Sequence, residues 1–206
     1  MTNFDRKSHW ENIYSTKSLE EVSWHQPIPT TSLQFFTKNN IPLDAKIIDI
    51  GGGDSFLVDN LLELGYTNLS VLDISAAAIE RAKVRLNENA SKVTWIVSDI
   101  TQFKPEVSYD FWHDRAVFHF LTEETEIEQY RTLVADAVVS NGTLAVGTFS
   151  ENGPLKCSGI EIKRYSIVEL TTCFESNFEP VEKFQINHDT PFGTVQHFTF
   201  VRFKKK

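Results

Sequence analysis

The 206-residue chain has few cysteines, no long apolar run and a shortage of basic residues. Its two cysteines, Cys157 and Cys173, lack metal-ligand spacing, so we expect two free thiols in a reducing cytoplasm. No apolar run approaches the roughly 20 residues that cross a bilayer, and the first residues form no apolar signal segment. Lys and Arg number 20 against 28 Asp and Glu, a net charge of −8, which argues against a polyphosphate partner. We therefore expect a cytoplasmic protein without a membrane or nucleic-acid partner.

Apolar and aromatic residues, by contrast, are plentiful. Apolar residues make up 41% of the chain, which excludes wholesale disorder. The 16 Phe, 5 Tyr and 4 Trp predict an aromatic-rich core or pocket. A length of 206 residues suits one domain with a full core and is short for two ordinary ones. We expect a single domain over residues 1–206, whereas the oligomeric state does not follow from the sequence.

From residue 46 onward, β-rich segments alternate with helical patterns. The segment 46–50 is almost continuously apolar, which is typical of a strand covered on both faces. Further strands are predicted at 69–73, 93–97, 109–112, 143–149, 181–186 and 195–203, and helices at 56–64, 75–86, 123–139 with Thr122 as cap, and from Ser166 onward. This alternation predicts an α/β fold with a Rossmann-like, seven-stranded, mostly parallel sheet and helices on both faces. The last two strands are too close for a helical crossover, so they form an antiparallel C-terminal hairpin.

Two helices are expected ahead of the sheet. Ser8 and Glu11 have the spacing of a capping box, which predicts that the first helix begins at Ser8. A second helix is predicted over residues 32–38. Residues 1–40 then form a helical N-terminal segment and residues 41–206 form the Rossmann-like core. At the other end, the three lysines 204–206 are expected to be solvated.

The strongest chemical feature is the run Asp49-Ile50-Gly51-Gly52-Gly53-Asp54 between the first strand and a helix. Ligands bind at this carboxyl edge in open α/β sheets, and glycine lets them approach the backbone. A dinucleotide-binding turn has a third glycine at the position that Phe56 occupies here, so a pyrophosphate fits poorly at this helix N-terminus. The acidic residues beside the turn suit a cationic ligand instead.

Two further acids follow neighbouring strands. Asp73 ends the second strand, where a carboxylate can accept both hydroxyls of a ribose. Asp99 follows the third strand, placed to accept a hydrogen bond from an adenine amino group while Ile100 packs on the ring. These positions indicate an adenosine-containing cofactor. S-adenosylmethionine, which carries a sulfonium and an α-amino group, satisfies both requirements.

The segments around these residues resemble class I S-adenosylmethionine-dependent methyltransferases over about residues 9–203. The resemblance implies that Gly51 and Gly53 line the methionine part, beside Asp49. It also implies that Asp73 and the following Ile74 hold the ribose, and that Asp99 and Ile100 hold the adenine. The product would be S-adenosylhomocysteine, and no metal is implied. Position 55 is often glycine in that family, and Ser55 departs from the pattern.

The N-terminal aromatics Trp10, Tyr14 and Trp24 resemble the lid of thiol, thiopurine and halide methyltransferases, and also the start of some elongation-factor lysine methyltransferases. In those families the lid covers the cofactor and helps to form the substrate pocket. The stretch 112–116, Trp-His-Asp-Arg-Ala, is similar to that of the thiopurine-type enzymes, whereas 64–68 is more like the lysine group. We favour a small thiol or related chalcogen as acceptor. A protein lysine, another small molecule and a non-catalytic cofactor-binding role stay open.

Three residues after the fourth strand are catalytic candidates. Arg115 can stabilise a thiolate or a substrate carboxylate, with a structural ion pair as the rival role. His113 or His119 can accept a proton, although His119 lies in an apolar stretch where packing is the more common role. The same site lacks the Asn/Asp-Pro-Pro motif of amino methyltransferases that act on DNA bases or glutamine. We expect in-line transfer to a small-molecule substrate.

Overall fold

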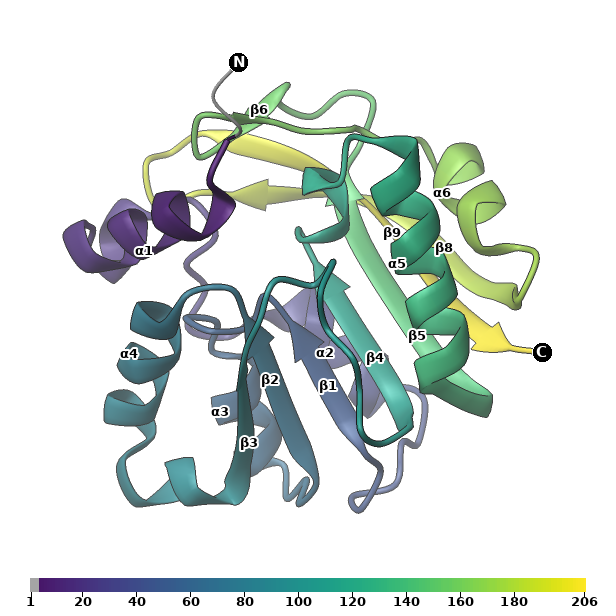
Figure 1. The fold of residues 1–206 in the computed structure, drawn as a ribbon, viewed down its shortest axis with the longest axis horizontal. Coiled ribbons are helices and arrows are strands. Elements are labelled where there is room, and N and C mark those ends of the chain that lie inside the picture. Colours follow the sequence, from purple (N-terminus) through teal and green to yellow (C-terminus); the bar gives the residue numbers. More distant parts are fainter. Residues whose placement is uncertain (1–3) are drawn as a thin grey trace.

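Seven strands form one sheet in the computed structural model, which describes residues 4–206 (Figure 1). The sheet order is β3-β2-β1-β4-β5-β9-β8. The strands are β1 (Ile47–Ile50), β2 (Leu69–Asp73), β3 (Val93–Val97), β4 (Tyr109–Arg115), β5 (Val138–Phe149), β8 (Phe178–Asp189) and β9 (Val195–Lys205). Strands β1 to β5 pair in parallel, and β9 pairs antiparallel with both β5 and β8. The predicted mostly parallel sheet with an antiparallel C-terminal hairpin is confirmed.

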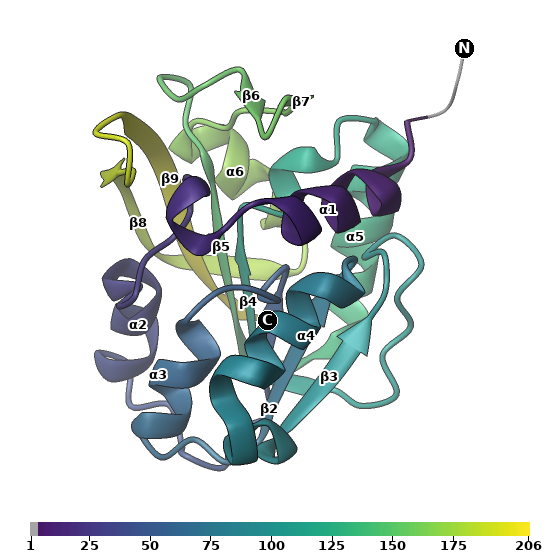
Figure 2. The ribbon, with the colours of Figure 1, turned by 90° about the vertical axis from the view of Figure 1, so that its left-hand side faces the viewer.

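Helices cover both faces of this sheet (Figure 2). They are α1 (Arg6–Thr16), α2 (Thr30–Thr37), α3 (Leu57–Glu63), α4 (Ala76–Leu86), α5 (Glu124–Ala137) and α6 (Ile167–Phe174), with short 3-10 turns at Leu19–Glu21, Asn87–Lys92 and Phe118–Phe120. Successive strand residues point to opposite faces. One core therefore joins Ile48 to α5 and α6, and the other joins Ile47 to α2 and α3. None of the helices in residues 4–206 combines the length and apolar character of a membrane crossing.

Several predicted boundaries hold and others move. Ser75 caps α4, accepting a hydrogen bond from the Ala78 N–H, and Ser166 and Glu169 form the predicted capping box of α6. Helix α1 begins earlier than Ser8, because the Asp5 side chain accepts from the Ser8 N–H and caps the helix one turn sooner. Helix α5 begins at Glu124 after Glu123, so the predicted cap at Thr122 is wrong.

The three C-terminal lysines are not a free solvated end. Lys204 donates to the Asn141 carbonyl at 2.8 Å, and Lys206 donates to the Glu175 carbonyl at 2.6 Å. Lys205 donates to the carbonyls of Ala135 and Val138 at the end of α5. Cationic side chains are favourable at helix C-termini, where the last carbonyls lack partners. This basic run therefore fixes β9 to the ends of α5 and α6.

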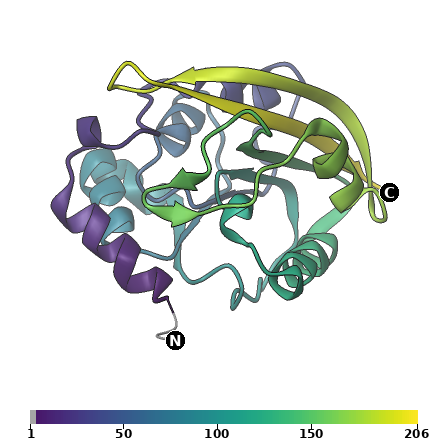
Figure 3. The same cartoon turned by 90° about the horizontal axis from the view of Figure 1, so that it is seen from above.

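Helix α1 packs beside α4 at one side of the molecule (Figure 3). Its Glu11 carboxylate accepts from the Ser75 hydroxyl and from the N–H groups of Ala76 and Ala77, at 2.8–3.1 Å, which caps the start of α4. Arg81 of α4 donates in return to the Tyr14 carbonyl at the end of α1. The described part of the predicted N-terminal segment is thus attached to the core by reciprocal caps. Residues 1–3 of that segment lie outside the described residues.

Candidate functional site

A cavity lies where β1, β2 and β4 end, and the glycine turn forms its floor. Gly51 has a φ of +68°, and a Cβ there would meet Val117 Cγ2 at 2.2 Å, so no other residue fits without rearrangement. A Cβ on Gly52 would meet Asp49 Oδ2, also at 2.2 Å. The two glycines that line the cavity are Gly51 and Gly52. Predicted Gly53 lies behind them, where it donates its N–H to Asp73 Oδ2 at 3.1 Å.

Asp49 is the acid closest to the turn and lies against the cavity. Its Oδ1 is 2.7 Å from His113 Nδ1, and His113 Nε2 is 2.9 Å from the Ser32 hydroxyl. All three side chains are buried and all three line the cavity. Asp49 Oδ2 is buried without a hydrogen-bond partner in residues 4–206. A buried carboxylate oxygen without a partner is costly, so this atom marks a place where a cationic donor belongs.

Asp73 lies one strand away and is held by the backbone. Its two oxygens accept from the N–H groups of Ser75 and Gly53 at 2.9 and 3.1 Å. Burial raises the pKa of Asp73 to about 7, and these two backbone hydrogen bonds oppose the shift, while Asp49 and Asp54 add to it. Asp73 therefore titrates near neutral pH in the cofactor-free protein.

The predicted adenine residues also meet at this edge. Asp99, Ile100 and Ile74 all line the cavity. Asp99 Oδ1 accepts from both the N–H and the hydroxyl of Thr101, at 2.9 and 2.8 Å, which fixes the carboxylate. Ile100 is buried in the core below. The structure thus brings together the three acids Asp49, Asp73 and Asp99, each at or near the carboxyl end of a different strand.

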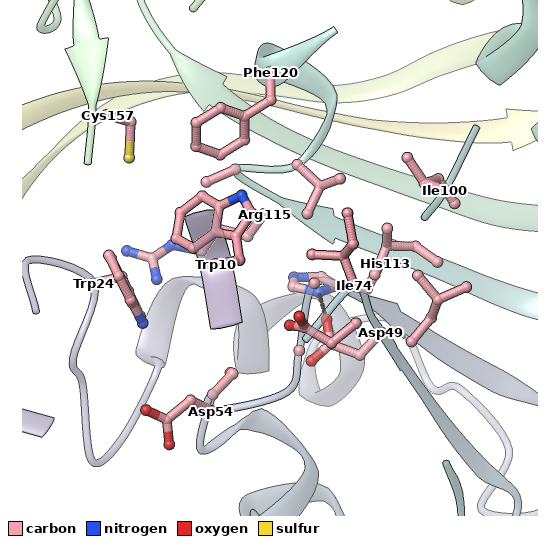
Figure 4. Close-up of a pocket in the computed structure, with 18 of the residues that line it drawn as sticks. Trp10, Trp24, Asp49, Asp54, Ile74, Ile100, His113, Arg115, Phe120 and Cys157 are labelled. Atoms are coloured by element: carbon pink, nitrogen blue, oxygen red, sulfur yellow. Dashed lines mark hydrogen bonds and ion pairs between the residues drawn. The ribbon is translucent and has the colours of Figure 1, made fainter. Parts of the chain in front are cut away.

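An aromatic cover closes the cavity from the side of α1 (Figure 4). Trp10 packs against Tyr14, Trp24 and Phe120 with ring centroids 5.3–5.9 Å apart. Burial raises the pKa of Tyr14 well above its ordinary value, so its hydroxyl stays neutral. All three predicted lid aromatics, Trp10, Tyr14 and Trp24, line the cavity.

Arg115 projects into the cavity from the end of β4 without an acidic partner. Its guanidinium makes no ion pair with any carboxylate in residues 4–206. It lies 5.1 Å from the ring centre of Phe198, a cation–π distance. Burial lowers the pKa of Arg115 to about 10, with Asp49 opposing the shift, so the group is cationic at neutral pH. The rival role of a structural ion pair is therefore wrong.

The neighbours of Arg115 in the sequence serve the fold. Asp114 accepts from the N–H groups of Val117 and Phe118 and from the Tyr130 hydroxyl, so it organises the turn after β4. His119 is fully buried and does not line the cavity. Burial lowers the pKa of His119 to about 3, with the Arg115 charge contributing. The predicted proton-accepting role of His119 does not fit this position, because its ring is enclosed by apolar side chains.

Some cavity residues do not stand out in the sequence. Ser32 reaches the cavity from α2, and Phe198 reaches it from β9. Cys157 lines the cavity from a short hairpin of β6 (Lys156–Cys157) and β7 (Ile160–Glu161) within the segment 151–165. Burial raises the pKa of Cys157 to about 11, so the thiol stays protonated. Only the nearby glycine at 159 hints at this hairpin in the sequence.

Comparison with known proteins agrees with this architecture. Residues 47–145 match the family described as "Methyltransferase domain". The solved structure of the N-methyltransferase NodS from Bradyrhizobium japonicum, in complex with S-adenosyl-l-homocysteine, superposes with a TM-score of 0.74 at 16% identity, covering 98% of this chain and 99% of that one. Residues 47–145 thus match a methyltransferase-domain family, and the chain has the fold of this solved methyltransferase structure.

Two other similarities bear on the methyltransferase domain. Human "EEF1A lysine methyltransferase 2" is 23% identical over 111 residues, which are 50% of this chain and 47% of that protein. The chain thus spans about half the length of this curated relative. A structure titled "Conversion of a Disulfide Bond into a Thioacetal Group during Echinomycin Biosynthesis" superposes with a TM-score of 0.78 at 16% identity, covering 97% of this chain and 93% of that one. At these identities the structural likeness establishes the fold.

The cavity has several features that suit S-adenosylmethionine. The unpartnered Asp49 Oδ2 suits a cationic amino group, and Gly51 leaves the backbone open. Asp73 and Asp99, predicted to bind ribose and adenine, line the same cavity. The structure holds no group of three His, Cys, Asp or Glu side chains arranged for a metal ion within residues 4–206.

Proposed function

We propose that the protein transfers a methyl group from S-adenosylmethionine to a small nucleophilic acceptor, most readily a thiol or related chalcogen. The observation that carries the proposal is the Arg115 guanidinium, which has no carboxylate partner in residues 4–206. It lies in an aromatic-covered cavity that the glycine turn and the three acids also line. An arginine without a carboxylate partner is suited to an anion. A thiolate or an acceptor with a carboxylate supplies that anion.

The cofactor side and the acceptor side use different residues of the same cavity. Asp49, Asp73 and Asp99 are assigned to the amino, ribose and adenine groups, and Ile74 and Ile100 to packing on the nucleoside. Bound S-adenosylmethionine supplies an electrophilic methyl group on a positively charged sulfur. Trp10 and Trp24 cover the cavity and exclude water, which keeps the cation and its acceptor in one orientation.

Thiol chemistry fits the lack of an available histidine base among the predicted candidates. Both ring nitrogens of His113 already have partners, and His119 does not line the cavity. A thiol with an ordinary pKa of about 8.5 is partly ionised at neutral pH, and the Arg115 charge favours the thiolate. The thiolate lone pair forms the new S–C bond while the methyl–sulfonium bond breaks towards the leaving sulfur. The thiol proton goes to solvent before transfer.

A protein lysine is the second candidate. It is supported by the similarity to the human enzyme named for lysine methylation. A lysine ammonium must lose a proton from a pKa of about 10.4 and would approach the Arg115 cation, which opposes it. The small acceptor is therefore the preferred substrate.

A substrate screen with methyl-labelled S-adenosylmethionine tests the proposal. Small thiols, sulfide and selenols are offered first, followed by a cell lysate resolved on a gel. We expect label in the small-molecule fraction and loss of that turnover in Arg115→Met. Labelling of a protein band without any thiol turnover would replace the small acceptor with a protein substrate.

A further inference from the structure

The chain Ser32–His113–Asp49 joins three buried side chains from three different elements: helix α2, strand β4 and strand β1. The exposed fractions are 2% for Ser32, 3% for His113 and 4% for Asp49, so water does not compete for these hydrogen bonds. His113 and Asp49 are also direct partners in the register of β4 and β1. Their geometry is therefore fixed by the sheet itself.

The hydrogen bonds along this chain place a proton between His113 and Asp49. Asp49 Oδ1 in its carboxylate form can only accept, so His113 Nδ1 carries the proton that lies between them at 2.7 Å. In the neutral ring Nε2 then accepts from the Ser32 hydroxyl at 2.9 Å. Both nitrogens are occupied within the fold. His113 has no free nitrogen to take a proton from an acceptor in the cavity.

The other end of the chain is the unpartnered Asp49 Oδ2. The absence of a side chain on Gly52 provides the space beside this oxygen, because a Cβ there would lie 2.2 Å from it. With Oδ1 held by His113, the carboxylate cannot turn to satisfy Oδ2 elsewhere without breaking a buried hydrogen bond. Oδ2 is therefore kept available to the cavity that Asp49 lines.

We propose that His113, itself held by Ser32, is a positioning residue that orients Asp49 toward the cationic amino group of S-adenosylmethionine. This replaces the proton-accepting role predicted for His113 from the sequence. The inference rests on the proposed function, since it needs a cofactor with an ammonium group. It assigns to helix α2, ahead of the sheet, a part in cofactor binding through Ser32.

Two substitutions separate positioning from mere packing. The amide nitrogen of His113→Asn falls near the place of Nδ1 and still donates to Asp49. The amide of His113→Gln falls near Nε2, so it reaches Ser32 and leaves Asp49 Oδ1 without its donor. S-adenosylhomocysteine binding is measured by calorimetry for both variants and the unmodified protein, together with the unfolding midpoint without ligand.

We expect His113→Gln to weaken binding at least tenfold, about 1.4 kcal/mol, and His113→Asn to stay within about threefold of the unmodified protein. Equal losses in both variants, or losses that follow the unfolding midpoints, would overturn the positioning role. An unmodified protein that does not bind S-adenosylhomocysteine would instead overturn the proposed function.

A second measurement needs no substitution and so does not depend on the variants folding. Nitrogen-15 spectra of histidine-labelled protein report which ring nitrogen of His113 carries a proton. We expect a protonated Nδ1 both before and after S-adenosylhomocysteine is added. A bare Nδ1 would place a lone pair against the Asp49 carboxylate and overturn the proposal.

Discussion

Asp73 gives cofactor binding a defined pH dependence. The pKa of Asp73 is raised to about 7 chiefly by burial. In the proposed role the carboxylate accepts the ribose hydroxyls in its ionised form. The ionised fraction then rises from about 0.1 at pH 6 to about 0.75 at pH 7.5. If only the ionised form binds, S-adenosylhomocysteine affinity rises about eightfold over this interval.

Protein stability changes in the opposite direction in the same interval. Because the folded pKa lies above the ordinary value of 3.8, the folded state holds the Asp73 proton where the unfolded chain has lost it. This contribution to the free energy of unfolding is complete at low pH and is lost as pH rises through 7. Affinity therefore increases while the cofactor-free protein becomes less stable.

Calorimetric titration with S-adenosylhomocysteine at several values between pH 6 and 7.5 measures the effect. Asp73→Asn is the matched control, because the amide keeps the shape and has no proton to lose. We expect the variant to bind more weakly at pH 7.5 and to lose most of the slope. An unchanged slope in Asp73→Asn would assign the titration to another group and contradict the proposed control of affinity by Asp73.

Three other substitutions test separate parts of the structure. Glu11→Gln weakens the cap that α1 places on α4, so we expect the free energy of unfolding, measured by denaturant titration, to fall by about 1 kcal/mol. An unchanged midpoint would mean that α1 is not docked through this carboxylate. Arg115→Lys should keep cofactor affinity and raise the KM of an anionic acceptor at least tenfold; a shift in cofactor affinity alone would place Arg115 on the cofactor side. Lys205→Met should lower the free energy of unfolding by about 1 kcal/mol in the same assay. An unchanged free energy would mean that the C-terminal lysines are merely solvated.

The features predicted correctly from the sequence are local ones. The glycine turn and the acids Asp49, Asp73 and Asp99 lie at the carboxyl ends of strands that are neighbours in the sheet, so their clustering follows once the strands are placed. Ser75 also caps α4 as expected, because a cap depends on residues within one turn. Such short-range patterns are readable because their partners lie nearby in the sequence.

The contacts that the sequence pattern did not predict join residues far apart in the chain. Glu11 fits the spacing of a capping box, yet its carboxylate caps a helix that starts 65 residues later, at Ala76. His113 is satisfied by Ser32, which lies 81 residues away on α2. Lys205 reaches a carbonyl 70 residues distant, that of Ala135. None of these pairings follows from propensity or periodicity, because each forms only when separate elements have docked.

The most direct test of the account is whether the unmodified protein binds S-adenosylhomocysteine. Calorimetry with this product, and with NADH as the control adenosine cofactor, separates a sulfonium-cofactor site from a dinucleotide site. We predict saturable binding of one S-adenosylhomocysteine per chain and no binding of NADH. Absence of S-adenosylhomocysteine binding, or binding of NADH in its place, would contradict it.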